Sequence, residues 1–395
     1  MESRKIKPEE KLQSDMISAV SFMYARDFAD DLKAPAEHSE GYENVWAAFA
    51  DGGTLCASMT AHPFTVMFDG NSVPMAGLGG VAALPEYRKG GAVRGMLAAA
   101  MMDMRERGQV FSYLYPFSHS FYRKFGYEIC FARTIATMPL AEFREFPKTG
   151  QLSFLTKDGD LAPYEQVYNA FIADKNLAIV RTAEQFERCL GRDPYSSRQY
   201  TYLWRKDGGV PKSWLSFSPE KTDGKSIMQV KEFVFADAEG LLGVLGHLPV
   251  FSAQLDTIRW EVPSSVDVYS LVCEPKKLKV ERQFGGMNRI VDVEKALNLM
   301  YAPQGSGGVN VAVIDEFLPF NSGTYAVNWA DGLVCASRSD ATADMKVSVG
   351  TLAQLAAGYT TPQQAVFAGN ASVYGNMEAL GRLFAKKNLY ISDMF

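Results

Sequence analysis

Three basic side chains lie within seven residues of one glycine-rich turn, the segment of the chain best suited to chemistry. Arg88, Lys89 and Arg94 surround Gly90 and Gly91, between an apolar stretch and a helical pattern. The start of a helix presents backbone N–H groups without an intrahelical acceptor and the positive end of the helix dipole. Glycine also lets an anion approach the backbone closely. The turn therefore predicts a pyrophosphate-binding site, against the alternative of a solvated hairpin with incidental basic residues.

A second candidate for chemistry is Tyr122, in the aromatic segment 116–127. The segment follows a short apolar run and predicts a short helix, which would place the Tyr122 hydroxyl near the mouth of the glycine turn. A tyrosine of ordinary pKa, near about 10, can protonate a departing thiolate whose conjugate acid has a pKa near about 8.5. The alternative is a packed aromatic ring with a hydrated hydroxyl. The turn upstream favours the catalytic interpretation.

The apolar patterns predict the elements that hold these residues. Residues 12–32 are expected to form a helix, whose core-facing positions would be Met16, Ala19, Val20 and Met23. Residues 73–84, 110–115 and 127–138 are expected strands, and Asp69-Gly70 marks a hairpin. The helix after the turn has a single apolar stripe at i, i+3 and i+4 spacing. Its members are Val93, Met96, Leu97, Ala100, Met101 and Met104.

The rest of the chain predicts two further domains. A linker is expected near residues 139–150, and the following region pairs helices with strands. Residues 227–248 repeat the order of the first domain, a strand and a turn followed by either a strand or a helix, without its basic turn, so they indicate a degenerate second copy. From Gly285 onward the pattern is that of a third, α+β domain, whose last helix is expected over 377–387.

The composition narrows the class of protein. A formal net charge of −5 disfavours a nucleic acid as the main ligand and permits a cationic one. The five cysteines form no CxxC pair or Cys/His cluster, so neither a metal site nor a disulfide framework is expected. No run approaches the roughly 18 apolar residues of a membrane span, and the charged N-terminus lacks an apolar leader. These features predict a cytoplasmic protein.

The turn, the tyrosine and the Phe125-Gly126-Tyr127 sequence together resemble the GNAT superfamily of acetyl-CoA-dependent N-acetyltransferases, chiefly over residues 40–135. The resemblance is closer to the enhanced-intracellular-survival (Eis) family, which has a turn of the form Arg-x-x-Gly-x-x-Arg. Val93 departs from the general GNAT pattern at its last small position, and the Eis pattern tolerates that departure. The resemblance implies a GNAT domain over 1–140, a degenerate GNAT-like domain over 141–284 and a sterol-carrier-like α+β domain over 285–395.

The resemblance also implies roles for individual residues. The backbone of Val81, Ala82 and Ala83 would pair with the pantetheine arm as an added strand does. Phe117 and Ser118 would lie along the other side of the cofactor, and Tyr122 would be the general acid. The α-carboxylate of Phe395 would be the general base. The residues that would bind the pyrophosphate are Arg88, Lys89, Gly90, Gly91, Ala92, Val93 and Arg94.

The end of the chain also has an interpretation from its residues alone. Residues 389–395 are apolar and aromatic, which predicts that they dock on the protein, since a fraying tail rarely exposes such side chains. Docking by itself does not make a base. Rival bases are Asp30, Asp31, His119 and Glu128.

The predicted function is acetyl transfer from acetyl-CoA to a primary amine of a bulky cationic acceptor, such as an aminoglycoside, a polyamine or a lysine side chain. An acidic, aromatic run at residues 26–31 would suit such an acceptor, and a solvated helix face is the equally open alternative. The resemblance adds a homo-hexamer. The alternatives are a lipid or sterol carrier built on the last domain, and a GNAT-fold binding protein without turnover.

Overall fold

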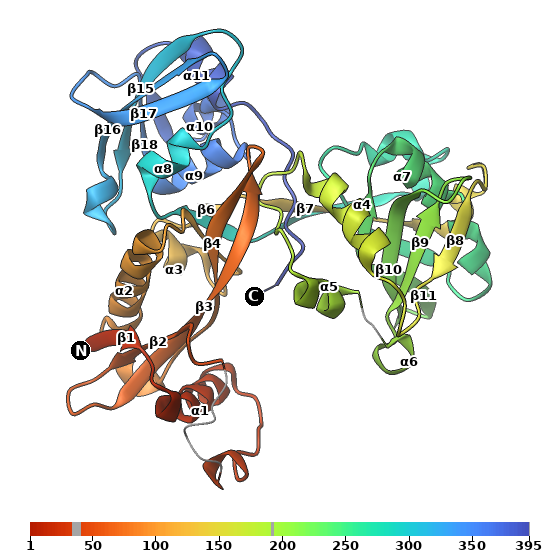
Figure 1. Ribbon diagram of the computed structural model, residues 1–395, viewed down its shortest axis with the longest axis horizontal. Helices are drawn as coiled ribbons and strands as arrows, with labels where there is room; N and C mark the ends of the chain where they lie inside the picture. The colour runs from red at the N-terminus through yellow and green to blue at the C-terminus, as the bar shows by residue number, and fades with distance from the viewer. Residues whose placement is uncertain (34–40, 191–192, 395) are drawn as a thin grey trace.

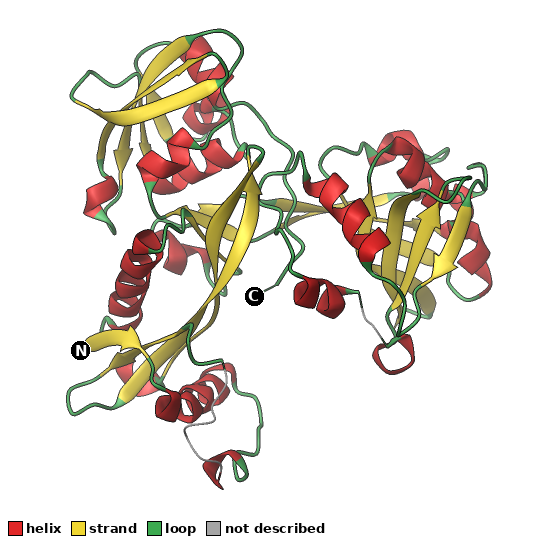
Figure 2. Ribbon diagram, viewed as in Figure 1, coloured by secondary structure: helices red, strands yellow, loops and turns green. Residues whose placement is uncertain are grey.

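Three β-sheets organise the chain into three lobes, coloured red to orange, green and blue along the chain (Figure 1). The computed structural model describes residues 1–33, 41–190 and 193–394. Helices pack against each sheet (Figure 2), so the expected α+β class is confirmed. No helix of the described residues is both long and apolar enough to cross a membrane.

The first sheet holds the glycine turn and Tyr122. Its strands, in spatial order, are β1 (Glu2–Lys5), β2 (Val45–Phe49), β3 (Leu55–Phe68), β4 (Asn71–Ala83), β5 (Phe111–Leu114), β14 (Met287–Ile290) and β6 (Glu128–Ile129). The predicted hairpin at Asp69-Gly70 joins β3 and β4, and both residues have positive φ, as a tight turn of this kind requires. Helix α2 (Ala92–Glu106) covers the sheet and buries Met96, Leu97, Ala100, Met101 and Met104, which confirms the predicted stripe.

The first helix differs from its prediction in length and in facing. Helix α1 (Lys11–Phe22) ends where Met23 takes a left-handed φ of 56°, ten residues earlier than expected. Its buried residues are Ser14 and Ile17, whereas Met16, Val20 and Met23 are exposed. The spacing rule identified an apolar face, but the neighbouring face of the same helix is the one that packs on β3 and β4.

The second sheet repeats the plan of the first. Its strands, in spatial order, are β13 (Lys279–Phe284), β7 (Ala132–Pro139), β12 (Thr257–Val262), β11 (Lys225–Phe235), β10 (Pro211–Thr222), β9 (Tyr200–Arg205) and β8 (Gln151–Phe154). Its helices are α4 (Ala162–Ile172), α5 (Ala183–Cys189), α6 (Pro194–Ser197) and α7 (Ala238–Leu245). Of the strand and the helix left open after the turn that follows β11, the structure has the helix, α7.

The single strand predicted over 127–138 is divided between two sheets. Strand β6 belongs to the first sheet and β7 to the second, and the chain changes sheets at residues 130–131. It returns between β13 and β14, where the amide of Gly285 donates to the carbonyl of Phe131 (2.9 Å). The domain limits expected at residues 140 and 285 stay a prediction.

The third sheet forms the C-terminal lobe. Its strands, in spatial order, are β17 (Leu333–Ser339), β16 (Gly323–Ala330), β15 (Gly307–Ile314), β18 (Met345–Ser348) and β19 (Ala371–Val373). Its helices are α8 (Val293–Asn298), α9 (Val349–Ala357), α10 (Pro362–Phe367) and α11 (Met377–Leu383). The last helix stops four residues before its predicted end, because Phe384 has non-helical dihedral angles.

The chain leaves the C-terminal lobe as a tail that runs down between the other two lobes (Figure 1). The amide of Asn176 donates to the carbonyl of Asn388 (2.9 Å), and the amide of Tyr390 donates to the carbonyl of Asn176 (3.1 Å). Leu389, Tyr390 and Ile391 are buried. The predicted docking of the tail is therefore confirmed over these residues.

Candidate active site

An opening between β4 and β5 forms one side of the candidate site. The two strands pair in parallel only over Met75–Leu78 and Phe111–Leu114. Beyond Leu78, a bulge at Gly80, which has a φ of 61°, displaces β4. Among the described strands none pairs with the β5-facing edge of Val81, Ala82 and Ala83. Backbone groups on this edge can pair with an extended ligand as an added strand does, although the Ala83 carbonyl already accepts from the Ser21 hydroxyl (3.2 Å) and from Nε of Arg88 (3.3 Å).

The basic turn follows this strand edge directly. A 3-10 turn (Pro85–Tyr87) leads through Lys89 and Gly91, with φ of 66° and 87°, into the first residue of α2. No side chain caps this helix, so the amides of its first turn stay available to a ligand. Arg88, Lys89 and Arg94 are exposed, and within the described residues none pairs with a carboxylate. This arrangement is suited to a diphosphate.

Tyr122 lies on the short helix α3 (His119–Arg123), whose N-cap Ser118 accepts a hydrogen bond from the amide of Phe121 (3.4 Å). The Tyr122 ring is buried and packs edge-on against Phe117 and Phe121 at 5.5 and 5.2 Å between centroids. It shares one apolar cluster with side chains of β4 and of the start of α2. The structure thus brings the predicted acid, the strand edge and the turn together in one lobe.

The protonation of Tyr122 differs from the expectation for an ordinary tyrosine. Burial raises the pKa of Tyr122 to about 12, so the phenol stays protonated at physiological pH. No group of the described chain is bonded to its hydroxyl, which leaves the O–H free to donate to a ligand. Complete transfer of this proton to a thiolate of conjugate-acid pKa about 8.5 is unfavourable by about 5 kcal/mol. A hydrogen bond to the sulfur that strengthens as its charge develops avoids most of that cost.

The Phe125-Gly126-Tyr127 sequence has a structural explanation. Phe125 packs on Phe317 at 5.1 Å between centroids, and the Tyr127 hydroxyl is 2.6 Å from the Ser112 hydroxyl. A side chain at position 126 would clash, since its Cβ would lie 1.7 Å from Nη1 of Arg289. Glycine is therefore required for the close approach of this arginine beneath the tyrosines.

Sequence reasoning missed the buried pair that this glycine accommodates. Arg289 lies in the fully buried strand β14, and its Nη2 donates to Oδ2 of Asp315 at 2.6 Å. Both side chains are almost completely buried, at 0% and 1% exposed. Asp315 Oδ1 also accepts from the amides of Phe317 and Leu318, at 3.1 and 2.9 Å. The one available signal was an arginine in the short segment Met287–Ile290 before an apolar pair of residues, since an arginine that becomes buried needs a partner.

Three of the four rival bases have ion-pair partners, whereas the buried Nε2 of His119 has no hydrogen-bond partner among the described residues. Asp30 pairs with Lys33 (3.3 Å) and Asp31 with Arg26 (2.9 Å), both on the surface. Glu128 accepts a bidentate contact from Arg123, with both distances 2.8 Å. The ring of His119 packs edge-on against Phe284. Phe395 lies outside the described residues, so its expected role stays a prediction.

A cavity of about 290 Å³ lies where the tail passes between the N-terminal and middle lobes. Its lining joins parts of the chain that are far apart in sequence, namely Phe64 of β3, Arg181, Glu232 of β11, and Asp393 and Met394 of the tail. Burial raises the pKa of the Asp393 carboxyl, against the opposing effect of Arg181. No motif could have revealed this cavity, because its residues share no spacing.

The middle lobe has the same strand and helix plan but a different helix start. Strand β11 pairs in parallel with β12 over only three residues, as β4 does with β5 over four. However, α7 is capped by Asp237, whose Oδ1 accepts from the amide of Gly240 at 2.9 Å. Lys212 pairs with Asp237 and with Glu239. A carboxylate occupies the position that an anion would need, so this copy lacks a diphosphate site.

Comparisons with known proteins agree with this architecture. Residues 2–130 and residues 177–290 each match an acetyltransferase (GNAT) domain, and residues 293–392 match a sterol carrier protein domain. No curated protein sequence matches the chain.

Solved structures share the fold over the whole chain. A GCN5-related N-acetyltransferase from Anabaena variabilis is 21% identical, with a TM-score of 0.86 and 100% of each chain covered. One from Kribbella flavida is 20% identical, with a TM-score of 0.79, covering 100% of this chain and 98% of its own. Eis1 from Mycobacterium abscessus is 20% identical, with a TM-score of 0.81 and 100% of each chain covered.

These matches define the class of protein. The chain carries two GNAT acetyltransferase domains followed by a sterol carrier protein domain, and it is an enzyme of the acetyltransferase class. Its three-domain fold is shared with Eis1 from end to end, in agreement with the Eis resemblance of the sequence.

Proposed function

We propose that the protein is an acetyl-CoA-dependent N-acetyltransferase that acts on primary amines by direct transfer. The observation that carries the proposal is the end of β4 that β5 leaves unpaired, which leads into an uncapped basic helix start, together with the buried Tyr122 in the apolar cluster that β4 and α2 share. Acetyl-CoA supplies the thioester carbon that the amine attacks, with CoA as the leaving group.

Different residues of the opening would bind different parts of acetyl-CoA. The backbone of Val81, Ala82 and Ala83 would pair with the pantetheine arm. Phe117 and Ser118 would flank its other side, at the start of α3. The turn would hold the diphosphate through the amides and side chains of Arg88, Lys89, Gly90, Gly91, Ala92, Val93 and Arg94.

Proton handling accounts for the rest of the chemistry. The attacking amine loses a proton to a base, for which we propose the carboxylate of Phe395. Tyr122 donates its O–H to the sulfur as the carbon–sulfur bond breaks. Holding the amine and the thioester together supplies the larger part of the acceleration, and no covalent enzyme intermediate is needed.

The acceptor we propose is a bulky cationic amine, such as an aminoglycoside, a polyamine or a lysine side chain. The formal net charge of −5 supports this choice. The acidic run near Phe28 supports it less than expected, because Asp30 and Asp31 both have ion-pair partners. All five cysteines are free thiols, which fits the cytoplasm. A homo-hexamer remains our proposal for the assembly.

Two measurements test the proposal. Calorimetry with acetyl-CoA should detect binding, and its absence in folded protein would favour the lipid-carrier alternative. A free-thiol assay over kanamycin, spermine and a lysine peptide should then detect CoA release that depends on the amine. Binding without release from any amine would indicate a GNAT-fold binding protein.

A further inference from the structure

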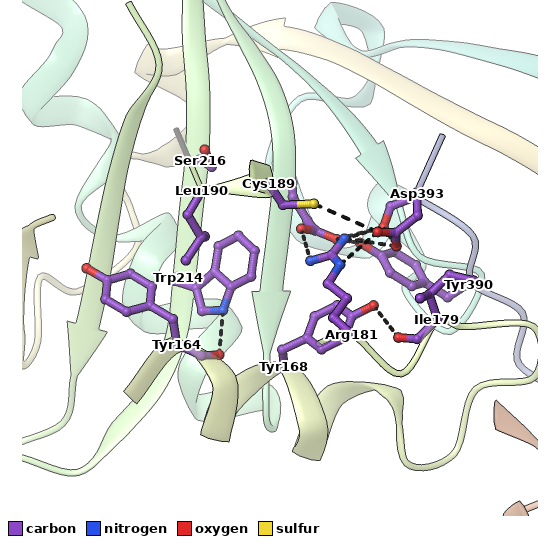
Figure 3. A network of polar contacts seen from close by, with 12 residues as sticks. Tyr164, Tyr168, Ile179, Arg181, Cys189, Leu190, Trp214, Ser216, Tyr390 and Asp393 are labelled. Carbon is purple, nitrogen blue, oxygen red and sulfur yellow. Dashed lines mark hydrogen bonds and ion pairs between the residues drawn. The ribbon is translucent and has the colours of Figure 1, made fainter. Parts of the chain in front are cut away.

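Arg181 joins the tail to the middle lobe through a set of charged hydrogen bonds (Figure 3). Its Nε and Nη2 donate to the two carboxylate oxygens of Asp393 at 2.9 and 3.1 Å. Its Nη1 and Nη2 donate to the two oxygens of Glu232 at 2.7 and 2.9 Å. Nη2 also lies 3.0 Å from the Ser392 hydroxyl. One planar guanidinium thus binds two carboxylates in a forked geometry.

This guanidinium is held rigidly. The Arg181 side chain is 2% exposed, and it lies over the ring of Tyr168 at 4.2 Å and that of Phe186 at 5.6 Å. The two rings belong to α4 and α5, so the position of Arg181 is set by two helices of the middle lobe. Glu232 and Asp393 are also buried, at 7% and 8% side-chain exposure.

The tail is held from the N-terminal lobe as well. The hydroxyl of Tyr115, one residue beyond β5, donates to the carbonyl of Asp393 at 3.0 Å. Tyr390 and Ser392 both donate their hydroxyls to Oε1 of Glu232. The tail therefore crosses from the middle lobe to the end of β5, which borders the proposed cofactor opening. It also forms one wall of the cavity of about 290 Å³ through Asp393 and Met394.

We propose that Arg181 is a positioning residue that, with Glu232, locks residues 389–394 as a wall of the acceptor site. The inference rests on the proposed function. Without the guanidinium, the carboxylates of Glu232 and Asp393 would face each other in a buried setting. Glu232 is held in strand β11, so the tail that carries Asp393 is the part that would move. Loss of Arg181 therefore releases the tail, while the cofactor opening in the N-terminal lobe keeps its own strands and turn.

The test compares Arg181→Gln with Arg144→Gln, an exposed arginine of the same lobe. Hydrogen exchange of the tail peptide should rise at least tenfold in Arg181→Gln and stay unchanged in Arg144→Gln. With kanamycin, or spermine where kanamycin is not acetylated, kcat/KM for the amine should fall at least about 50-fold. The Kd for CoA should stay within twofold, which separates tail release from general unfolding. Arg181→Lys should recover part of the loss, because it keeps the charge without the fork.

Two results would overturn the inference. One is a mobile tail with unchanged kcat/KM, and the other is a loss of CoA affinity as large as the loss of amine turnover. If Arg181→Gln does not fold, Asp393→Asn is tested in its place, because Arg181 then keeps its ion pair with Glu232. Unchanged hydrogen exchange of the tail together with unchanged kcat/KM in Asp393→Asn would also refute the proposal. Wild-type protein inactive with every amine would instead refute the proposed function, while the exchange comparison still tests the lock.

Discussion

An acidic side chain placed at Gly91 should abolish most of the affinity for CoA. Gly91 is the N-cap of α2 with a φ of 87°, and a Cβ built there has no atom within 4 Å. Gly91→Asp therefore adds a carboxylate without a clash, next to the first-turn amides proposed to bind the diphosphate. The middle lobe already carries such an acid at the equivalent helix start, Asp237.

The size of the effect follows from Coulomb's law. At about 5 Å, two unit charges repel by about 0.8 kcal/mol in water and by about 3 kcal/mol at an effective dielectric constant of about 20. The turn is exposed, so about 1–1.5 kcal/mol per charge is reasonable. A diphosphate with two charges then loses about 2–3 kcal/mol, which is about a 30- to 150-fold increase in Kd.

The control is Gly91→Asn, which has nearly the same shape and the same tolerance of positive φ but no charge. Calorimetry with CoA at low ionic strength should give a Kd within a few-fold of wild type for Gly91→Asn. The deficit of Gly91→Asp should shrink as salt is added, because the charges are exposed. If the two variants lose the same affinity, backbone strain rather than charge is responsible, and the electrostatic argument fails.

Four further outcomes are expected. Tyr122→Phe should lower kcat about 100-fold with unchanged Kd for CoA, since only the donor to the sulfur is lost; full activity would remove Tyr122 from its role. The donor form of Tyr122 is present below its pKa of about 12 and is lost as pH rises through it, so kcat should show no basic limb from this group below about pH 11. Calorimetry should give one CoA per chain, because Asp237 blocks the second helix start; two would contradict this account. Asp315→Asn should lower the free energy of unfolding in urea by about 3–5 kcal/mol, since Arg289 is left as an unpaired buried charge, whereas the exposed Asp331→Asn should change it by less than about 0.5 kcal/mol.

Local patterns predicted those elements whose structure depends on nearby residues. The Asp69-Gly70 hairpin and the stripe of α2 each follow from a periodicity or from turn chemistry. The first helix failed the same kind of reasoning, because two adjacent faces of α1 are apolar and only the tertiary contact with β3 and β4 selects one. The exchange of strands between sheets at residues 130–131 was equally hidden, since each short strand looks the same in either sheet.

The candidate site divides in the same way. The turn before α2 and the short helix that carries Tyr122 could be predicted, because each depends on contiguous residues, whereas the roles of residues 88–94 and Tyr122 stay a prediction. The partners that hold the site from outside could not. Arg181 is separated along the chain by 51 residues from Glu232 and by 212 from Asp393, and the three side chains meet only when the tail packs on the middle lobe.

The two GNAT domains share one strand and helix plan but differ at the start of the helix that follows the central strand. Strand β4 ends at an uncapped basic turn and leaves its edge open, whereas β11 ends at a helix that its own acid, Asp237, already caps. Because that acid excludes a diphosphate, the second copy is free of the constraints that cofactor binding places on strand and turn. Its strand β11 instead supplies Glu232, which binds Arg181 and accepts a hydrogen bond from Ser392 of the tail. On the proposal that the tail forms a wall of the acceptor site, the degenerate domain would contribute to the site of its neighbour through position, since the buried charges that hold the tail need the desolvated surroundings that a packed domain provides.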